Sequence, residues 1–157
     1  KRGTHRQVHS MVKKVLFDTS TLVAALLEEH QLYDACFPWL KQALTQEFTG
    51  YISTHTLAEL YSVLTRLPLQ PKLQPNEVQA LLANLNNIHK VFLNGDDYAQ
   101  VIKRLVSLNV TGGGIYDALI SQAALNVNAD ILLTANPKDF VHLGDDVAKI
   151  VRVPAEI

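Results

Sequence analysis

The sequence is poor in the features that crosslink a chain or anchor it in a membrane. Cys36 is the one cysteine among 157 residues, so neither an internal disulfide nor a cysteine-based zinc site can form. The longest uninterrupted apolar run, residues 22–27, is far shorter than the roughly 18 residues that a membrane helix requires. The start of the chain also lacks the charged head and apolar core of a secretory signal. We therefore expect a cytoplasmic protein that does not associate with membranes.

An excess of charge of one sign is also missing, because the formal net charge is −1. Residues 1–10 lack apolar periodicity and precede Met11, so we expect them to be a disordered or artificially added extension of a single domain at 11–157. Without the extension's three basic residues, the chain carries 11 basic and 15 acidic residues, a net charge of −4. The bulk charge does not attract polyanions, so chemistry on a nucleic acid would have to recruit a cation.

Short apolar runs alternate with longer helical stretches after residue 13, and 48% of the residues are hydrophobic. This alternation is typical of βα units on a parallel sheet, so the sequence predicts an α/β fold. The predicted strands are 15–17, 51–53, 91–93, 131–133 and 150–153, the last at an edge of the sheet. The predicted helices are 20–29, 33–47, 56–67, 75–87, 96–108 and 115–127.

Ligands in open α/β sheets bind beyond the carboxyl ends of the strands, so the residues that follow each apolar run are the candidates for a site. Asp18 ends the first run and is followed by three hydroxyl residues, among them Ser20. Asp, Ser and Thr are also common helix caps, which is the simpler interpretation of this segment by itself.

Two further acids have similar alternatives. Glu59 completes the capping-box pattern that begins at Thr56, but it also borders the apolar stripe of its helix and can reach a crevice at the rim. Asp117 follows three glycines and opens an apolar helix, where a carboxylate complements the helix dipole. Ser121, four residues later, shares the face of Asp117.

The last buried run, residues 131–133, ends in Thr134, Asn136, Lys138 and Asp139, which could form an ordinary turn. Acids that converge on one crevice repel each other unless a cation lies among them. Oxygen ligands favour Mg²⁺ or Mn²⁺, which lowers the pKa of a bound water and neutralises a phosphodiester in its transition state. The pattern therefore favours metal-dependent hydrolysis of a phosphate ester.

Four segments together resemble the PIN-domain ribonucleases, and most closely the VapC toxins of prokaryotic toxin–antitoxin pairs. They are residues 15–20, 56–60, 114–120 and 133–140. The resemblance implies a three-layer α/β/α sandwich with a mainly parallel sheet, single-stranded RNA as the substrate, and Mg²⁺ or Mn²⁺ as the cofactor. It also implies a homodimer and a small antitoxin partner.

Carried over by position, the resemblance makes Asp18, Glu59 and Asp117 metal-coordinating and catalytic acids. The fourth place is open between Asn136, a neutral metal ligand, and Asp139, a catalytic acid. Further positions of the site are the supporting hydroxyls Ser20, Thr134 and Ser121 and the substrate-binding Lys138. Lys41, Arg66, Lys103 and Arg104 are further basic candidates, although a solvated helix surface explains most of them.

Other functions have weaker support in the sequence. The sequence lacks the G-x-S-x-G turn of a serine hydrolase and the H-E-x-x-H motif of a zinc protease. The histidines at 55, 89 and 142 suit surface or packing positions. A magnesium-dependent phosphatase of the haloacid type would have a second Asp two residues after Asp18, where Ser20 stands. A catalytically silent PIN-like binding or assembly module is the alternative outside enzymology.

Overall fold

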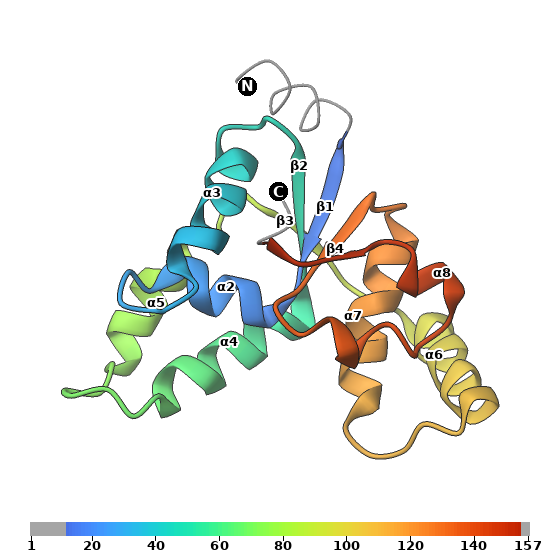
Figure 1. Ribbon diagram of the computed structural model, residues 1–157. Helices are drawn as coiled ribbons and strands as arrows, with labels where there is room; N and C mark the ends of the chain where they lie inside the picture. The colour runs from blue at the N-terminus through green and yellow to red at the C-terminus, as the bar shows by residue number, and fades with distance from the viewer. Residues whose placement is uncertain (1–11, 155–157) are drawn as a thin grey trace.

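The computed structural model describes residues 12–154, so the predictions for residues 1–10 lie outside the described residues. Strands and helices alternate along the described chain (Figure 1). The elements are β1 (Lys14–Phe17), α2 (Thr19–Leu26), α3 (Tyr33–Leu44), β2 (Thr49–Ser53), α4 (Thr54–Arg66), α5 (Pro75–Ala83), β3 (His89–Val91), α6 (Gly95–Leu108), α7 (Gly114–Asn126), β4 (Ile131–Leu133), η1 (Pro137–Asp139), α8 (Asp145–Ala148) and β5 (Val151–Arg152).

The strands form one sheet in the order β3-β2-β1-β4-β5, and every neighbouring pair is parallel. The chain first adds strands on one side of β1 and then returns to add β4 on the other side. The strand order therefore reverses between β1 and β4, which is where open α/β sheets bind ligands. The predicted parallel sheet and the predicted edge position of the last strand are confirmed.

Alternate residues of the central strands enter two different cores, because successive side chains of a strand point to opposite faces. In β1, Val15 and Phe17 belong to one buried cluster and Leu16 to the other. In β4, Ile131 and Leu133 join the first cluster and Leu132 the second. Both faces of the sheet are thus covered by apolar residues, which explains the continuous apolar runs in the sequence.

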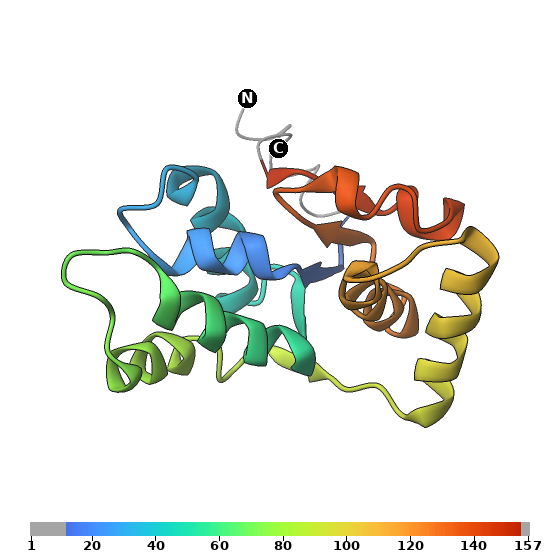
Figure 2. The same ribbon diagram turned by 90° about the horizontal axis from the view of Figure 1, so that it is seen from below.

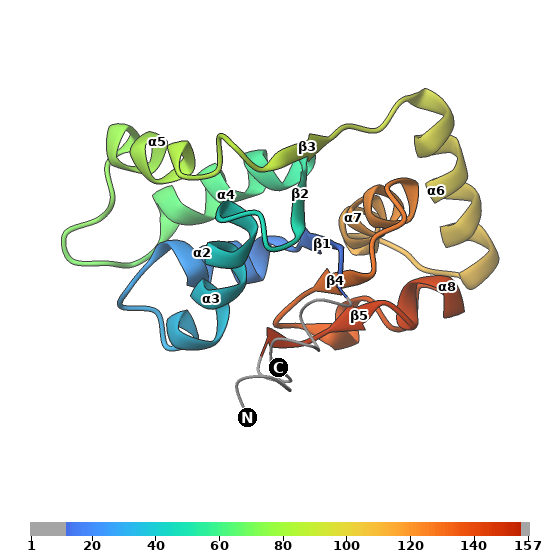
Figure 3. The ribbon, with the colours of Figure 1, turned by 90° about the horizontal axis from the view of Figure 1, so that it is seen from above.

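Helices cover both faces and complete the three-layer α/β/α sandwich. The first cluster includes buried side chains of α2, α3, α4 and α5, and the second includes those of α6, α7 and α8. Figure 1 shows the two groups of helices on opposite sides of the strands, and the views from below and above (Figures 2 and 3) show the same division. None of the helices between residues 12 and 154 combines the length and apolar character needed to cross a membrane.

Some boundaries differ from the predicted ones. β3 spans His89–Val91 rather than 91–93, because its pairing ends where Val91 meets Ser53, the last residue of β2. Phe92 consequently leaves the sheet and is 76% exposed. α3 ends at Leu44 rather than 47, and Gln46 takes a left-handed conformation with φ of 61°. The short helices η1 and α8 were not predicted, because segments of three or four residues carry no helical period.

An ion pair joins α6 to α8 at the outside of the second core. The Arg104 guanidinium donates two hydrogen bonds to the Asp146 carboxylate, at 2.8 and 2.7 Å, and a third to the Leu143 carbonyl at 2.8 Å. The hydrogen bonds from Arg104 hold the pKa of Asp146 below its ordinary value. Arg104 therefore has a structural role, which makes it a poor candidate for binding a substrate phosphate.

The close approach of α3 to β2 depends on Gly50, where a Cβ atom would lie 2.7 Å from the Ala43 Cβ. We expect Gly50→Ala to lower the free energy of unfolding by about 1–3 kcal/mol, because neither backbone element can yield without disturbing the core. Urea unfolding followed by circular dichroism measures this change. Gly95→Ala is the matched control, since no atom lies within 4 Å of its added Cβ. Equal stabilities of the two variants would contradict the packing argument.

Candidate active site

Asp18 lies at the carboxyl end of β1, at the point where the strand order reverses. Asp18 is 5% exposed and occupies the N-cap position of α2, but its side chain makes no capping hydrogen bond, so the carboxylate does not act as the cap that the sequence suggested. Instead its Oδ2 accepts hydrogen bonds from the Ser20 Oγ at 2.7 Å and the Thr134 Oγ1 at 2.8 Å. Burial raises the pKa of Asp18, the hydrogen bonds from Ser20 and Thr134 oppose this shift, and the charge of Glu59 adds to it.

The two hydroxyls also hold the turn that follows β4. The amide of Ala135 donates to the Ser20 Oγ at 3.0 Å, and the amide of Asn136 donates to the Thr134 Oγ1 at 3.0 Å. Each hydroxyl has one proton, which it donates to Asp18. The backbone amides therefore donate to the lone pairs that remain on the two hydroxyl oxygens. The predicted supporting positions of Ser20 and Thr134 thus connect the first acid to the last segment of the candidate site.

Glu59 lies in the second turn of α4, because that helix begins at Thr54 and is capped by the Ser53 side chain, which accepts from the His55 amide. The capping-box interpretation of Thr56 and Glu59 is therefore wrong. The Glu59 Oε1 instead accepts a hydrogen bond from the Thr19 Oγ1 at 2.8 Å. This bond joins α4 to the first residue of α2, directly after Asp18.

Asp117 lies in the first turn of α7 and is only half-buried. Burial, followed by the charges of Asp18, Asp139 and Glu59, raises its pKa to about 7, while His142 acts in the opposite direction. The three other acids are thus close enough to act on Asp117, although they come from three different parts of the chain. The proximity of these acids is the electrostatic signature expected of a functional site.

The remaining predicted residues take different positions around this group. The Ser121 hydroxyl donates a hydrogen bond to the Asp117 backbone carbonyl at 2.9 Å, so it contacts the helix backbone and not the Asp117 carboxylate. Asn136 precedes η1 with an exposed side chain that caps nothing, whereas Asp139 is half-buried and acts on Asp117. Lys138 lies between them and is exposed.

The carboxylates do not form a ready-made metal cage. Among residues 12–154, no three His, Cys, Asp or Glu side chains are arranged so that they could hold a metal ion together. Mg²⁺ commonly keeps several water ligands and binds through one or two carboxylates plus a substrate phosphate. The donor set here, which consists of carboxylates with a raised pKa and supporting hydroxyls, fits such a partly hydrated ion.

Three neighbours of the acids, His55, Tyr116 and His142, were not singled out as site residues from the sequence. The His55 and Tyr116 rings stack with centroids 5.2 Å apart and planes 4° apart, and the His55 Nε2 lies 3.6 Å from the Glu59 Oε1. The charge of His142 lowers the pKa of Asp117. His55 precedes Glu59 by one helical turn, and Tyr116 precedes Asp117 by one residue. These spacings are the features of the sequence that could have marked the two residues as neighbours of the acids.

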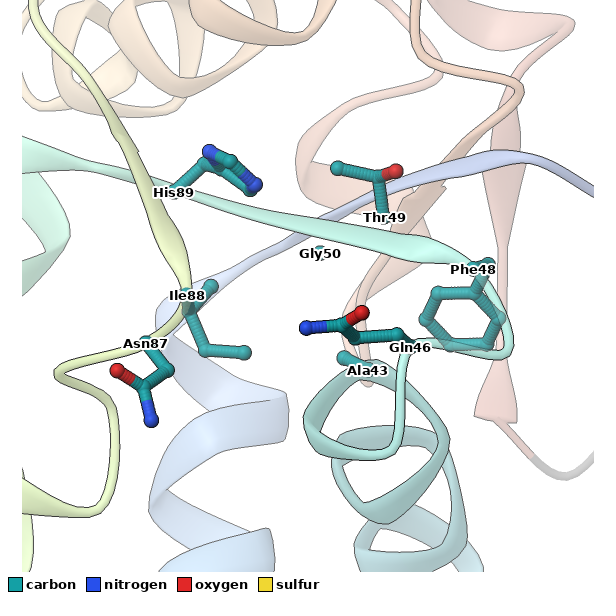
Figure 4. A pocket seen from close by; sticks show the side chains of 8 residues that line it. All are labelled: Ala43, Gln46, Phe48, Thr49, Gly50, Asn87, Ile88 and His89. Carbon is teal, nitrogen blue, oxygen red and sulfur yellow. The ribbon is translucent and has the colours of Figure 1, made fainter.

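A pocket of about 280 Å³ lies at the amino ends of β2 and β3 (Figure 4). Its lining includes Thr49 and Gly50, at the start of β2, and Ile88 and His89, at the start of β3. None of the candidate acids lines this pocket, so it is separate from the candidate site.

We expect Asp117→Asn to stabilise the metal-free protein at alkaline pH. The folded-state pKa of Asp117 is about 7, against about 3.9 in an unfolded chain, so ionisation destabilises the fold progressively as the pH rises from about 4 to 7. Removal of this charge should raise the free energy of unfolding by about 1–2 kcal/mol at pH 8, after allowance for solvent screening, and by almost nothing at pH 4. Thermal unfolding in chelator at both pH values measures the difference.

Asp96→Asn is the matched control for Asp117→Asn, because Asp96 also lies in the first turn of a helix but is exposed. We expect no stabilisation that grows with pH for this variant. A lower unfolding temperature for Asp117→Asn than for the wild type at pH 8 would refute the electrostatic account of the site.

Comparison with known proteins identifies the family. The family model of the PIN domain matches residues 15–145 of the chain. The chain is 33% identical over 115 residues to Ribonuclease VapC40 of Mycobacterium tuberculosis (strain CDC 1551 / Oshkosh), a match that covers 73% of this chain and 81% of VapC40. It is 31% identical over 114 residues to Ribonuclease VapC27 of M. tuberculosis (strain ATCC 25618 / H37Rv), with 73% and 79% covered.

Solved structures share the fold at lower identity. VapBC2 from Rickettsia felis, bound to a DNA fragment from its promoter, gives a TM-score of 0.63 at 21% identity over 89% of this chain and 98% of that one. FitAcB from Neisseria gonorrhoeae gives 0.63 at 21% identity over 91% and 99%. The sarcin-ricin-loop-cleaving toxin VapC20 of M. tuberculosis gives 0.58 at 16% identity over 75% and 86%. The profile match and the curated relatives show that the chain belongs to the PIN-domain family.

Proposed function

We propose that the chain is a divalent-metal-dependent endoribonuclease that hydrolyses phosphodiester bonds of single-stranded RNA. The observation that carries the proposal is the group of acids around Asp117, where burial and then the charges of Asp18, Asp139 and Glu59 raise the pKa of Asp117 to about 7. Acids that repel each other cost stability unless a cation joins them. The names of the curated relatives VapC40 and VapC27 add independent support for ribonuclease activity.

Asp18, Glu59 and Asp117 are the residues that would hold Mg²⁺ or Mn²⁺, one or two of them directly and the others through water bound to the ion, with Asp139 or Asn136 completing the site. Of the last two, Asp139 is favoured because its charge acts on Asp117. The bound ion would supply two effects, a lowered pKa of a water molecule and neutralisation of the charge on the phosphate. Because Ser20 and Thr134 orient the Asp18 carboxylate, the first acid is held in place before any ion binds.

The chain's own groups would then move the proton and position the substrate. Asp117 is one candidate to accept the proton of the attacking water, because it lies among the acids that would surround the ion and that water. Asp18 is the alternative acceptor, either directly or through a second water. Lys138, which is exposed on η1 between Asn136 and Asp139, would bind a substrate phosphate at the edge of the acidic group.

The biological role that we propose is that of a toxin held by a small antitoxin. The curated relatives carry VapC names, and the structural neighbours include VapBC2 of R. felis and FitAcB of N. gonorrhoeae. A homodimer in the cytoplasm is part of the same proposal. Copurification of the product of a neighbouring open reading frame, together with inhibition of RNA cleavage by that product, would test the role.

We expect purified protein to cleave short single-stranded RNA in Mn²⁺ or Mg²⁺ and to lose this activity in chelator. Asp18→Asn and Asp117→Asn should each lower kcat by about 100-fold or more, because each removes a charge at the reacting centre. Gel analysis of end-labelled RNA measures the rates. Asp34→Asn, an exposed acid on α3, is the control that should cleave like the wild type.

Three outcomes would decide against the nuclease assignment or its site. Cleavage that persists in both Asp→Asn variants would remove these residues from the mechanism. Protein that binds RNA without cutting any RNA in either metal would favour a catalytically silent binding module. Hydrolysis of a phosphate monoester in place of RNA would favour the phosphatase-like alternative.

A separate variant tests the supporting hydroxyls. Thr134→Val keeps the side-chain shape but removes both the hydrogen bond to Asp18 and the acceptor of the Asn136 amide, and Thr134 is fully buried. We expect about a 10- to 100-fold loss in metal affinity or activity, since outer groups that orient a ligand have effects of this size. Titration of activity against Mn²⁺ concentration measures it. Thr134→Ser, which keeps the hydroxyl, should restore most of the lost activity.

A further inference from the structure

We propose that the exposed face of Tyr116 is a stacking site for an RNA base next to the phosphate that is cleaved. This inference rests on the proposed ribonuclease function and adds a substrate contact to it. Tyr116 is 51% exposed, although its ring stacks on that of His55 with only 4° between the planes. One face of the Tyr116 ring is thus supported by protein, while a large part of the side chain remains open to solvent.

The ring pair lies beside the acids and connects two elements of the site. His55 belongs to α4 and Tyr116 to α7, and these helices pack against each other. The His55 Nε2 is 3.6 Å from the Glu59 Oε1, and Tyr116 is the residue before Asp117. Consecutive side chains of a helix point in directions about 100° apart around its axis. Tyr116 therefore borders the acidic group but points in a different direction from Asp117.

Stacking suits this position because the acids themselves repel RNA, and Lys138 is a single positive charge beside four carboxylates. The four carboxylates repel phosphate in the absence of a metal, and Arg104 is engaged by Asp146. Aromatic side chains bind single-stranded bases through their π faces, which requires no positive charge and tolerates any base. The His55 ring holds Tyr116 in a fixed plane, so little conformational entropy is lost when a base stacks on it.

The test measures RNA binding rather than cleavage. Short single-stranded RNAs of mixed sequence, each with one base replaced by an abasic site at a successive position, are titrated by fluorescence anisotropy in Ca²⁺. The integrity of each RNA is checked on a gel afterwards. With the wild-type protein, we expect an abasic site at one position beside the cleaved bond to weaken binding by about 5- to 100-fold.

Tyr116→Leu should bind the intact RNA as weakly as the wild type binds this abasic RNA, and the abasic site should then cause no further loss. Tyr116→Phe should behave like the wild type, because the ring is kept. Tyr98→Leu is the matched control, since Tyr98 is 44% exposed on α6 and belongs to neither helix of the ring pair. The loss caused by Tyr116→Leu should be the same at low and moderate salt, in contrast to the loss of a phosphate contact.

The outcomes separate the two proposals. If the wild-type protein cleaves RNA but the abasic penalty persists in Tyr116→Leu, or if Tyr116→Phe is as weak as Tyr116→Leu, the stacking site is refuted and the nuclease assignment stands. If the wild-type protein neither binds nor cleaves any of the RNAs, both proposals are refuted. Thermal unfolding of each variant confirms that the half-exposed ring has been removed from a folded protein.

Discussion

The burial of the Asp18 carboxylate is the constraint on which the rest of the candidate site depends. A buried carboxylate loses its hydration, and here hydrogen bonds from Ser20 and Thr134 replace part of that hydration. The same hydroxyls accept hydrogen bonds from the backbone amides of Ala135 and Asn136. These bonds fix the position of the turn after β4 relative to the end of β1. The position of η1, which carries Lys138 and Asp139, follows from this network.

Two acids of the protein show how environment separates structural from functional roles. Asp146 is paired with Arg104, and these hydrogen bonds lower its pKa, so its charge is satisfied and joins α6 to α8. Asp117 has its pKa raised to about 7 by burial and by like charges. Charge left without compensation in a fold is destabilising, and its retention points to a ligand that supplies the opposite charge. The acidic group and the aromatic pair beside it suit two parts of one substrate, the phosphate and a base.

The sheet and most of the helices were predictable because both faces of the central strands are buried. Short apolar runs such as residues 131–133 are typical of parallel strands covered on both sides, and the longer helices carry a clear period. Asp18, Glu59 and Asp117 were predictable as candidates because each follows a strand or opens a helix at the edge where ligands bind. The helix ends were less predictable, since α4 begins two residues before the cap that its sequence suggested.

The sequence by itself determined the α/β class, the order of the elements and the identity of the candidate acids, because these depend on local periodicity and on residues that lie close together along the chain. It left open whether each acid was a cap or part of a site. The fold adds the contacts of each side chain, because it brings Thr134 to Asp18, Thr19 to Glu59 and His55 to Tyr116. Such contacts join residues far apart in the sequence, and they form only when the strands pair and the helices pack on the sheet.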